Sequence, residues 1–227
     1  MISDNYSCIF VHIPKVAGQS IENFFLKLHN LDWNTREPLL LKYNPDPTKG
    51  PERLAHLLAE EYVNCGHTPK HTFDSYFKFA FVRNPWDRLV SEFTYREDYQ
   101  GLTFKHFVMN RLPKESQYTD SYRHIMPQTK FVFNNEGKQL VDFIGRFENL
   151  QQDFAYVCSK LNIPPAILPH INVSSSQSLK SKLTQLLKLK KKTKRLHYTD
   201  YYDAETQEIV GTMYAEDIKT FNYTFGN

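Results

Sequence analysis

The stretch IFVHIPKVAGQSIENFF, residues 9 to 25, has the layout of a strand, a loop and a helix. Segment 8–13 is apolar, rich in β-branched and aromatic residues, and stops at Pro14, which predicts a buried strand. Segment 20–29 follows the loop 14–20 and predicts a helix, because its apolar residues recur on one helical face: Ile21, Phe24, Phe25 and Leu28.

The same order of elements recurs in FKFAFVRNPWDRLVSEF, residues 77 to 93. Segment 77–82 predicts a second strand, and segment 86–95 predicts the helix that follows it. Strands that alternate with helices are typical of parallel sheets. The sequence therefore predicts an α/β fold in which a central, mainly parallel sheet is flanked by helices.

Weaker patterns complete the expected order of elements. Proline and glycine predict a loop over 32–50, and the serine-rich segment 174–178 predicts another. The remaining expected elements are helices over 52–62, 103–110, 150–161 and 204–220, and short strands over 130–133 and 143–147.

Length and composition are those of an ordinary globular protein. The chain has 227 residues, 41% hydrophobic and 15% aromatic, which suits a single domain over 1–227. No stretch approaches the roughly 18 to 20 apolar residues of a membrane span, and the N-terminus does not resemble a signal peptide. We therefore expect a soluble, cytoplasmic protein, whose oligomeric state the sequence leaves open.

Cysteine and histidine spacing predicts no metal site. The three cysteines are far apart with no CxxC spacing, and the chain has neither an HExxH motif nor an EF-hand loop. We interpret the cysteines as reduced thiols.

The net charge of +3 hides an uneven distribution. Segment 180–195 holds 8 of the 28 Lys and Arg residues and no acid, which leaves 20 basic against 25 acidic residues elsewhere. Such a run is usually a solvated surface, but it could also close over a nucleotide or meet an anionic substrate. Nucleic acid is not the expected partner, because no recognition-helix pattern accompanies the charge.

The loop 14–20 has the features of an anion site. Ligands of parallel sheets bind beyond the carboxyl ends of the strands, where this loop should lie. Gly18 would let the backbone approach a ligand, and the start of a helix attracts phosphate or sulfate. Lys15 adds a charge and Ser20 a hydroxyl. The alternative is an ordinary turn with an exposed Lys15 and a capping Ser20.

The order of these residues differs from that of a nucleotide-binding P-loop. In GxxxxGK[ST] the lysine directly follows a glycine, whereas here Lys15 precedes Gly18 by three positions. A standard NTPase loop is therefore disfavoured.

The second unit offers a second anion-binding group. Arg83 comes directly after a predicted strand, and its planar guanidinium suits a phosphate. Ser91 follows two turns into the helix and could add its hydroxyl. Alternatively, Arg83 pairs with Asp87 and Ser91 faces solvent.

Together these motifs resemble the paired signature of sulfotransferases that use 3′-phosphoadenosine 5′-phosphosulfate (PAPS). The likeness is to the Golgi carbohydrate sulfotransferases and their soluble bacterial relatives. It rests on HIPKVAGQS and FVRNPWDRLVSEF, and extends to FIGRFENLQQDF (143–154), LPHINVS (168–174) and segment 201–225.

The resemblance implies roles for both motifs. The first loop would hold the 5′-phosphosulfate with Lys15, Val16, Ala17, Gly18, Gln19 and Ser20. Arg83 and Ser91 would bind the 3′-phosphate. Relatives usually read PKTAGTS or PKTGGTS, so Val16 and Gln19 depart from the pattern.

The implied reaction moves a sulfuryl group from PAPS to a hydroxyl of a carbohydrate or glycolipid, without a metal. Lys15 would stabilise the bridging oxygen as the bond to sulfur breaks. His67, in CGHTPKH, is the expected base. His71, Glu60 and Glu61 are alternatives. Two other functions stay open: a magnesium-dependent kinase and a non-catalytic module that binds adenosine 3′,5′-bisphosphate (PAP).

Some residues receive weaker expectations. Arg123, His124 and Gln128 could line the acceptor cleft or belong to a plain connection. Arg146 and Glu148 are expected to form an ion pair. Loops 32–50 and 100–122 would choose the acceptor.

Overall fold

The computed structural model describes residues 1–164, 167–168 and 196–227. The basic segment 180–195, the predicted loop 174–178 and most of LPHINVS therefore lie outside the described residues.

The centre of the fold is a four-stranded sheet in the order β1-β2-β3-β4. The strands are β1 (Ile2–Ser3), β2 (Cys8–Val11), β3 (Phe77–Val82) and β4 (Phe143–Arg146). β1 is antiparallel to β2, whereas β2, β3 and β4 are mutually parallel, with Phe10 opposite Phe79 and Phe79 opposite Phe143. Sheets covered on both faces have near-continuous apolar strands. This explains CIFV and FKFAFV and confirms the predicted α/β class.

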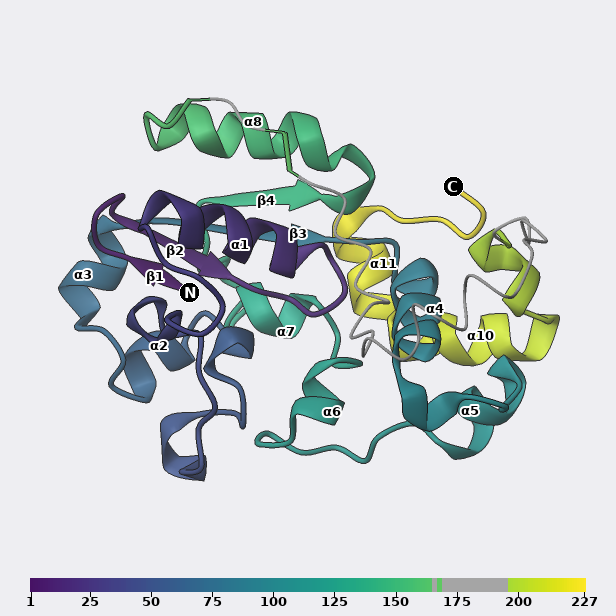
Figure 1. Cartoon of the computed structure of the whole chain (residues 1–227). Helices are drawn as coiled ribbons and strands as arrows, with labels where there is room; N and C mark the ends of the chain where they lie inside the picture. The colour runs from purple at the N-terminus through teal and green to yellow at the C-terminus, as the bar shows by residue number, and fades with distance from the viewer. Residues whose placement is uncertain (165–166, 169–195) are drawn as a thin grey trace, which may run out of the picture.

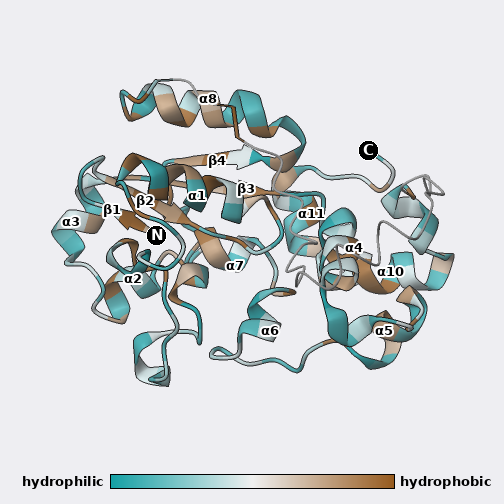
Figure 2. Ribbon diagram, viewed as in Figure 1, coloured by the Kyte–Doolittle hydropathy of each residue, from teal (hydrophilic) through white to brown (hydrophobic). Residues whose placement is uncertain are grey.

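Helices cover both faces of the sheet (Figure 1). In that view α1 (Gly18–Leu28) crosses the strands and α8 (Leu150–Lys160) lies above β4, whereas α2 (Glu61–Asn64) and α7 (Thr129–Val132) lie below the strands. Phe24 and Phe154 join α1 to α8 through perpendicular rings 5.0 Å apart. In Figure 2 the strands are mostly brown, which marks the apolar core between the layers.

A second helical layer lies beyond the carboxyl end of β3 (Figure 1). It consists of α4 (Pro85–Tyr95), α5 (Phe104–Asn110) and α10 (Ala204–Met213), with α11 (Ala215–Phe221) between it and the sheet. These helices share an apolar cluster that includes Trp86, Leu89, Phe107 and Val210. Tyr122 packs against both this cluster and the core of the sheet.

Short elements complete the described chain. They are helices α3 (Lys70–Ser75) and α6 (Asp120–Arg123), and 3₁₀ turns at Glu37–Leu39, Pro47–Lys49, Leu54–His56, Glu97–Tyr99, Phe147–Asn149 and Tyr198–Tyr201. Within the described ranges, no helix combines the length and the apolar character that a membrane span requires.

Three predicted elements need correction. Segment 130–133 is not a strand: α7 occupies it, because Asp217 accepts the N–H groups of Gln128 and Thr129 at the start of that helix. The helix expected over 52–62 is broken, because Ala59 leaves the helical path to bond Phe131 O.

The helix expected over 204–220 is two helices. Tyr214 separates them with a non-helical backbone, and its buried hydroxyl donates to Ile125 O at 2.6 Å. In both places a partner distant in sequence overrides the local helical pattern.

Candidate active site

The two loops picked out in the sequence meet at the carboxyl edge of the sheet. Lys15 follows β2 and Arg83 follows β3, and Arg83 Nη1 donates a hydrogen bond to Lys15 O at 3.0 Å. Parallel strands end at the same edge, so two stretches 68 residues apart come into direct contact.

The first loop has a strained backbone. Lys15 and Ala17 have φ values of 72° and 69°, in the left-handed region that costs a non-glycine residue roughly 1–2 kcal/mol. Val16 and Gly18 are not among the residues with positive φ. Alternation of this kind turns successive N–H groups toward one concave side, which is a geometry that binds anions.

The amides of this loop have no acceptor in the part of the chain that the structure describes. This holds for the N–H groups of Val16, Ala17, Gly18 and Gln19. Ala17 occupies the cap position of α1 and supplies no side-chain hydrogen bond. The first N–H groups of a helix lack intrahelical partners and attract anions, so four consecutive free amides at this helix start suit an anionic ligand.

Gly18 also has a role that the sequence did not predict. A Cβ at this position would lie 1.8 Å from Nε2 of His12, so the histidine ring already fills the space above the glycine. His12 is held there by Glu22, whose Oε1 is 2.6 Å from Nδ1. Gly18 is therefore required by packing within the protein. Ser20 is also corrected: it is buried inside the first turn of α1 and is not the cap.

One face of α4 connects the candidate donor-binding residues. Asp87, Ser91 and Tyr95 recur every four residues along it. Arg83 Nε donates to Asp87 Oδ2 at 2.8 Å, and Lys15 Nζ lies 3.4 Å from the centre of the Tyr95 ring. Ser91 lies one turn from each of these contacts. The Arg83–Asp87 pair that the sequence offered as an alternative thus exists alongside the contact with the first loop.

Arg83 keeps one end of its guanidinium available. Its Nε and Nη1 are hydrogen-bonded, and Phe147 lies 4.1 Å from the guanidinium carbon. No described residue accepts a hydrogen bond from Nη2. A planar fork with a free edge next to a row of unpaired amides suits a ligand with two anionic groups.

Lys15 lies in a strongly charged environment. Burial lowers its pKa to about 8; Glu92 opposes this change, and three arginines support it. One of them, Arg88, is 1% exposed and donates to Pro14 O, Met126 O and His124 O at 2.8–3.0 Å. Arg88 therefore joins the first loop to the segment that carries His124.

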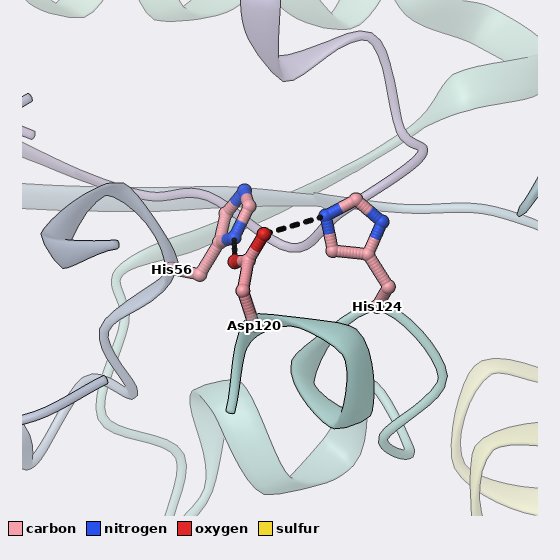
Figure 3. Close-up of side chains that lie close together, drawn as sticks. All are labelled: His56, Asp120 and His124. Atoms are coloured by element: carbon pink, nitrogen blue, oxygen red, sulfur yellow. Dashed lines mark hydrogen bonds and ion pairs between the residues drawn. The ribbon is translucent and has the colours of Figure 1, made fainter. Parts of the chain in front are cut away.

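Two histidines, His56 and His124, share the carboxylate of Asp120 (Figure 3). Asp120 and His124 lie at the two ends of α6, and His56 reaches them from the turn Leu54–His56. Asp120 Oδ1 is 2.6 Å from His56 Nδ1, and Oδ2 is 3.6 Å from His124 Nε2. The Tyr95 ring connects this group to Lys15, because it also stacks on His124 at 6.4 Å.

His56 has the arrangement of a general base. The carboxylate of Asp120 can only accept, so Nδ1 of His56 carries the hydrogen and Nε2 has a free lone pair. Nε2 of His56 has no hydrogen-bond partner among the described residues. Among these residues every fully buried side-chain polar atom has a partner, so Nε2 is not fully buried and contacts accessible space. Burial lowers the pKa of His56 to about 4, which keeps the ring neutral at physiological pH.

Glu92 holds His124 in place on the other side. Its Oε2 is 2.7 Å from His124 Nδ1, and its Oε1 accepts from Arg96 Nε at 2.7 Å. Burial alone would raise the pKa of Glu92, but His124, Arg96 and Lys15 hold this pKa at about 2. Glu92 therefore stays ionised and holds the ring of His124 close to Asp120 and His56.

The same cluster has ligand atoms suited to a divalent metal. The ring nitrogens and the carboxylate oxygen of His56, Asp120 and His124 all lie within 4.8 Å of one another. However, Arg53 Nε is 3.2 Å from Asp120 Oδ2, and a cation beside a ligand oxygen opposes metal binding. A site without a metal stays our prediction.

His67 lies at the other end of the sheet. It belongs to the connection between α2 and α3, which precedes β3, and its Nε2 is 2.7 Å from Lys49 O. Arg83 follows β3, and six strand residues span roughly 20 Å. The structure therefore does not bring His67 to Lys15 and Arg83.

The other candidate bases are also placed elsewhere. His71 lies in α3, next to the N-terminal end of β3, and Glu60 precedes α2. Glu61 pairs with the buried Arg123, whose Nη2 is 2.6 Å from Oε1. His56 belongs to no motif in the sequence, because it lies within segment 52–62, which predicts only a short helix. The partner Asp120 is 64 residues away.

Of the three residues that could line the acceptor cleft, only His124 lies in the candidate site. His124 joins the site, whereas Arg123 is fully buried and donates to Gln117 O as well as Glu61. Gln128 is fully buried and bonds the backbone of Arg83.

The expected pair of Arg146 and Glu148 is wrong. Arg146 donates to Phe221 O and lies over the Tyr223 ring, whereas Glu148 accepts from Asn84 N at 2.7 Å. The end of α11 and the start of α4 supply these partners, which are distant in sequence.

Comparison of the sequence with known protein families identifies the family of this chain. The model of the sulfotransferase family matches residues 1–224. The chain belongs to this family. As a family member it is an α/β sulfotransferase whose donor is PAPS, and the sequence resemblance is confirmed.

Individual relatives of this sulfotransferase are distant. An uncharacterized protein of Archaeoglobus fulgidus is 33% identical over 116 residues, 48% of this chain and 87% of that protein. Carbohydrate sulfotransferase 11 of Mus musculus is 21% identical over 260 residues, 100% of this chain and 67% of that protein. Carbohydrate sulfotransferase 14 of Mus musculus is 22% identical over 189 residues, 74% of this chain and 47% of that protein.

Proposed function

We propose that this sulfotransferase transfers the sulfuryl group of PAPS to a hydroxyl of a carbohydrate or glycolipid by in-line displacement. The observation that carries the proposal is the contact between Arg83 Nη1 and Lys15 O. It joins a row of unpaired amides to a guanidinium with a free edge. PAPS has a matching pair of anionic groups, the 5′-phosphosulfate and the 3′-phosphate.

The first loop suits the 5′-phosphosulfate. The amides of Val16 to Gln19 would bind its oxygens, because they are the unpaired donors of the site. Val16 itself is fully buried, so only its backbone can take part. Arg83 and Ser91, on the α4 side, suit the 3′-phosphate.

Lys15 would stabilise the leaving group. As the acceptor oxygen bonds to sulfur, the bond between sulfur and the bridging oxygen breaks, and negative charge develops on PAP. Lys15 Nζ lies over Tyr95 with only a weak cation–π contact, so it can turn toward that oxygen at low cost.

His56 is our proposed base in place of His67. The acceptor hydroxyl would give its proton to Nε2, and Asp120 would stabilise the imidazolium through Nδ1. His124 lies beside the same carboxylate, with its Nε2 3.6 Å from Asp120 Oδ2, and Glu92 holds His124 in place through Nδ1. Base and cation would thus flank the transferred group.

The acceptor class rests on two further points. Two relatives are named carbohydrate sulfotransferases. Tyr95 is 43% exposed beside the proposed site, and its ring could pack on a sugar once Lys15 turns from it toward the bridging oxygen. These observations support a saccharide acceptor and leave its identity to experiment.

Donor binding tests the proposal first. We expect PAP to raise the melting temperature far more than AMP, because only PAP offers a 3′-phosphate to Arg83. Arg83→Ala should remove the difference. Equal shifts with both nucleotides in the unmodified protein would contradict the assignment.

Transfer of labelled sulfate from PAPS to a panel of saccharides and glycolipids tests the reaction itself. His56→Ala should lower kcat by about 10² to 10⁴, the usual contribution of a general base, while His67→Ala serves as the control and stays within about twofold. A large loss in the His67 variant alone would restore the original choice of base. PAP binding without transfer to any acceptor would favour a non-catalytic module.

A further inference from the structure

We propose that Gln128, held in place by Asp217 of α11, is a positioning residue for recognition of the donor's 3′-phosphate. The inference rests on the proposed function of Arg83. Gln128 would act through the backbone of Arg83 and never touch the nucleotide.

The side-chain amide of Gln128 replaces a neighbouring strand at the end of β3. Its Oε1 accepts from Arg83 N at 2.9 Å, and its Nε2 donates to Arg83 O at 2.8 Å. The strand register ends one residue earlier, at Val82 opposite Arg146, and β2 reaches only Ala80. Without Gln128, neither strand could hold the backbone of Arg83.

Asp217 in turn fixes Gln128. Its Oδ2 accepts from the backbone N of Gln128 at 2.8 Å and from Nε2 at 3.3 Å. Its Oδ1 accepts from Thr129 N and Thr129 Oγ1, both at 2.9 Å. Gln128 and Asp217 are both 0% exposed, so the amide cannot exchange these bonds for water. A helix near the C-terminal end of the chain thereby sets the geometry of the phosphate site.

Two backbone hydrogen bonds determine the direction in which the Arg83 side chain leaves the chain. That direction lets Nη1 reach Lys15 O and Nε reach Asp87 while Nη2 stays available. Displacements of about 1 Å in a binding group can lower its contribution strongly. Loss of Gln128 should therefore weaken the recognition of the 3′-phosphate more than it weakens nucleotide binding in general.

Thr129→Val is a matched control for Gln128→Met. Both substitutions keep the approximate shape of the side chain and remove buried hydrogen bonds to Asp217. Only the Gln128 change also removes the bonds to Arg83. A purely structural role of the network predicts the same behaviour from both variants.

The test measures the dissociation constants of PAP and AMP by calorimetry in the full-length wild type and both variants. For Gln128→Met we expect PAP affinity to fall by about tenfold or more, the range of one well-placed bond to a charged group, with AMP affinity unchanged within about twofold. In Thr129→Val the ratio of the two affinities should stay as in the wild type. KM for PAPS should rise with Gln128→Met, while KM for the acceptor should not.

A proportional loss of PAP and AMP affinity in Gln128→Met would overturn the inference. So would an undiminished effect of Gln128→Met in an Arg83→Met background, because the two changes should act through one contact. A wild type without preference for PAP would instead contradict the proposed function. Should Gln128→Met not fold, Gln128→Asn, which is too short to bond both Arg83 groups, carries the same expectation.

Discussion

The two loops at the carboxyl edge of the sheet are both proposed to bind an anionic group of PAPS, but their backbone hydrogen bonding is opposite. In the first loop, four consecutive amides are left unpaired by the described residues, and the helix that follows has no side-chain cap. At the second, Gln128 takes the N–H of Arg83, Glu148 takes that of Asn84, and the Asn84 side chain caps α4.

The difference follows from which group binds the anion. A loop that binds through backbone amides must leave them unpaired, and the left-handed residues Lys15 and Ala17 hold these amides in place at a cost in strain. A junction that binds through a side chain needs a fixed backbone, so its backbone N–H groups donate to acceptors within the protein. The first loop therefore combines backbone strain with unpaired N–H groups, whereas the backbone N–H groups of Arg83 and Asn84 at the second are hydrogen-bonded.

The largest effect should come from removing the charge of the first loop. Lys15→Met should lower kcat for sulfuryl transfer by about 10³, because the loss of one donor to a developing negative charge costs on the order of 10² to 10³. Lys27→Met, on the exposed side of α1, is the control and should leave kcat unchanged. A loss below tenfold for Lys15→Met would show that the amides alone stabilise the leaving group.

Packing under the first loop can be tested next. Gly18→Ala should lower the free energy of unfolding by about 3 kcal/mol or more, since its Cβ would collide with the His12 ring. Gly211→Ala, whose nearest neighbour would be Trp86 at 3.5 Å, should be neutral or stabilise α10 by up to about 1 kcal/mol. Urea titrations of both variants measure the contrast. Equal stabilities would mean that His12 moves aside freely.

The first loop should also respond to pH. Lys15 has a pKa of about 8 in the free protein, and a bound anion favours its protonated form. The complex therefore holds the proton more tightly, and PAP affinity should fall by up to about tenfold per pH unit above pH 8. Lys15→Arg keeps its charge and should flatten this part of the profile. Calorimetry between pH 7 and 9.5 measures both, and a parallel decline in the arginine variant would point to another group.

The smallest effect concerns backbone strain. Ala17→Gly relieves a left-handed alanine and should raise the free energy of unfolding by about 0.5 to 1 kcal/mol, after the greater entropy of an unfolded glycine is subtracted. Asn84→Gly at the second junction should have the opposite sign, because it removes a cap and the bonds from Asn84 Nδ2 to Thr224 O and Asn227 O. If both substitutions changed the free energy of unfolding in the same direction, the proposed difference in backbone strain between the two loops would be wrong.

Both loops were accessible to sequence reasoning, but their supports were not. Lys15 and Arg83 each lie between a predicted strand and a predicted helix, and those elements follow from apolar spacing within about 20 residues. The pairs His56 with Asp120 and Gln128 with Arg83 are 64 and 45 residues apart. Their residue types carry no local sign of a partner, so the sequence predicts His67 as the base and does not indicate His56.

The linear chain determined the strand and helix order around each loop, the sulfotransferase resemblance and the two residues proposed to bind the anionic groups, Lys15 and Arg83. These depend on periodicities of two and 3.6 residues, which are set by backbone geometry close to each residue. Only the tertiary structure decided that Gly18 makes room for His12, that α7 is a helix, and that His56 pairs with Asp120. These outcomes depend on contacts between side chains that are far apart in the sequence and meet only when the chain folds. Local sequence patterns carry no information about such contacts.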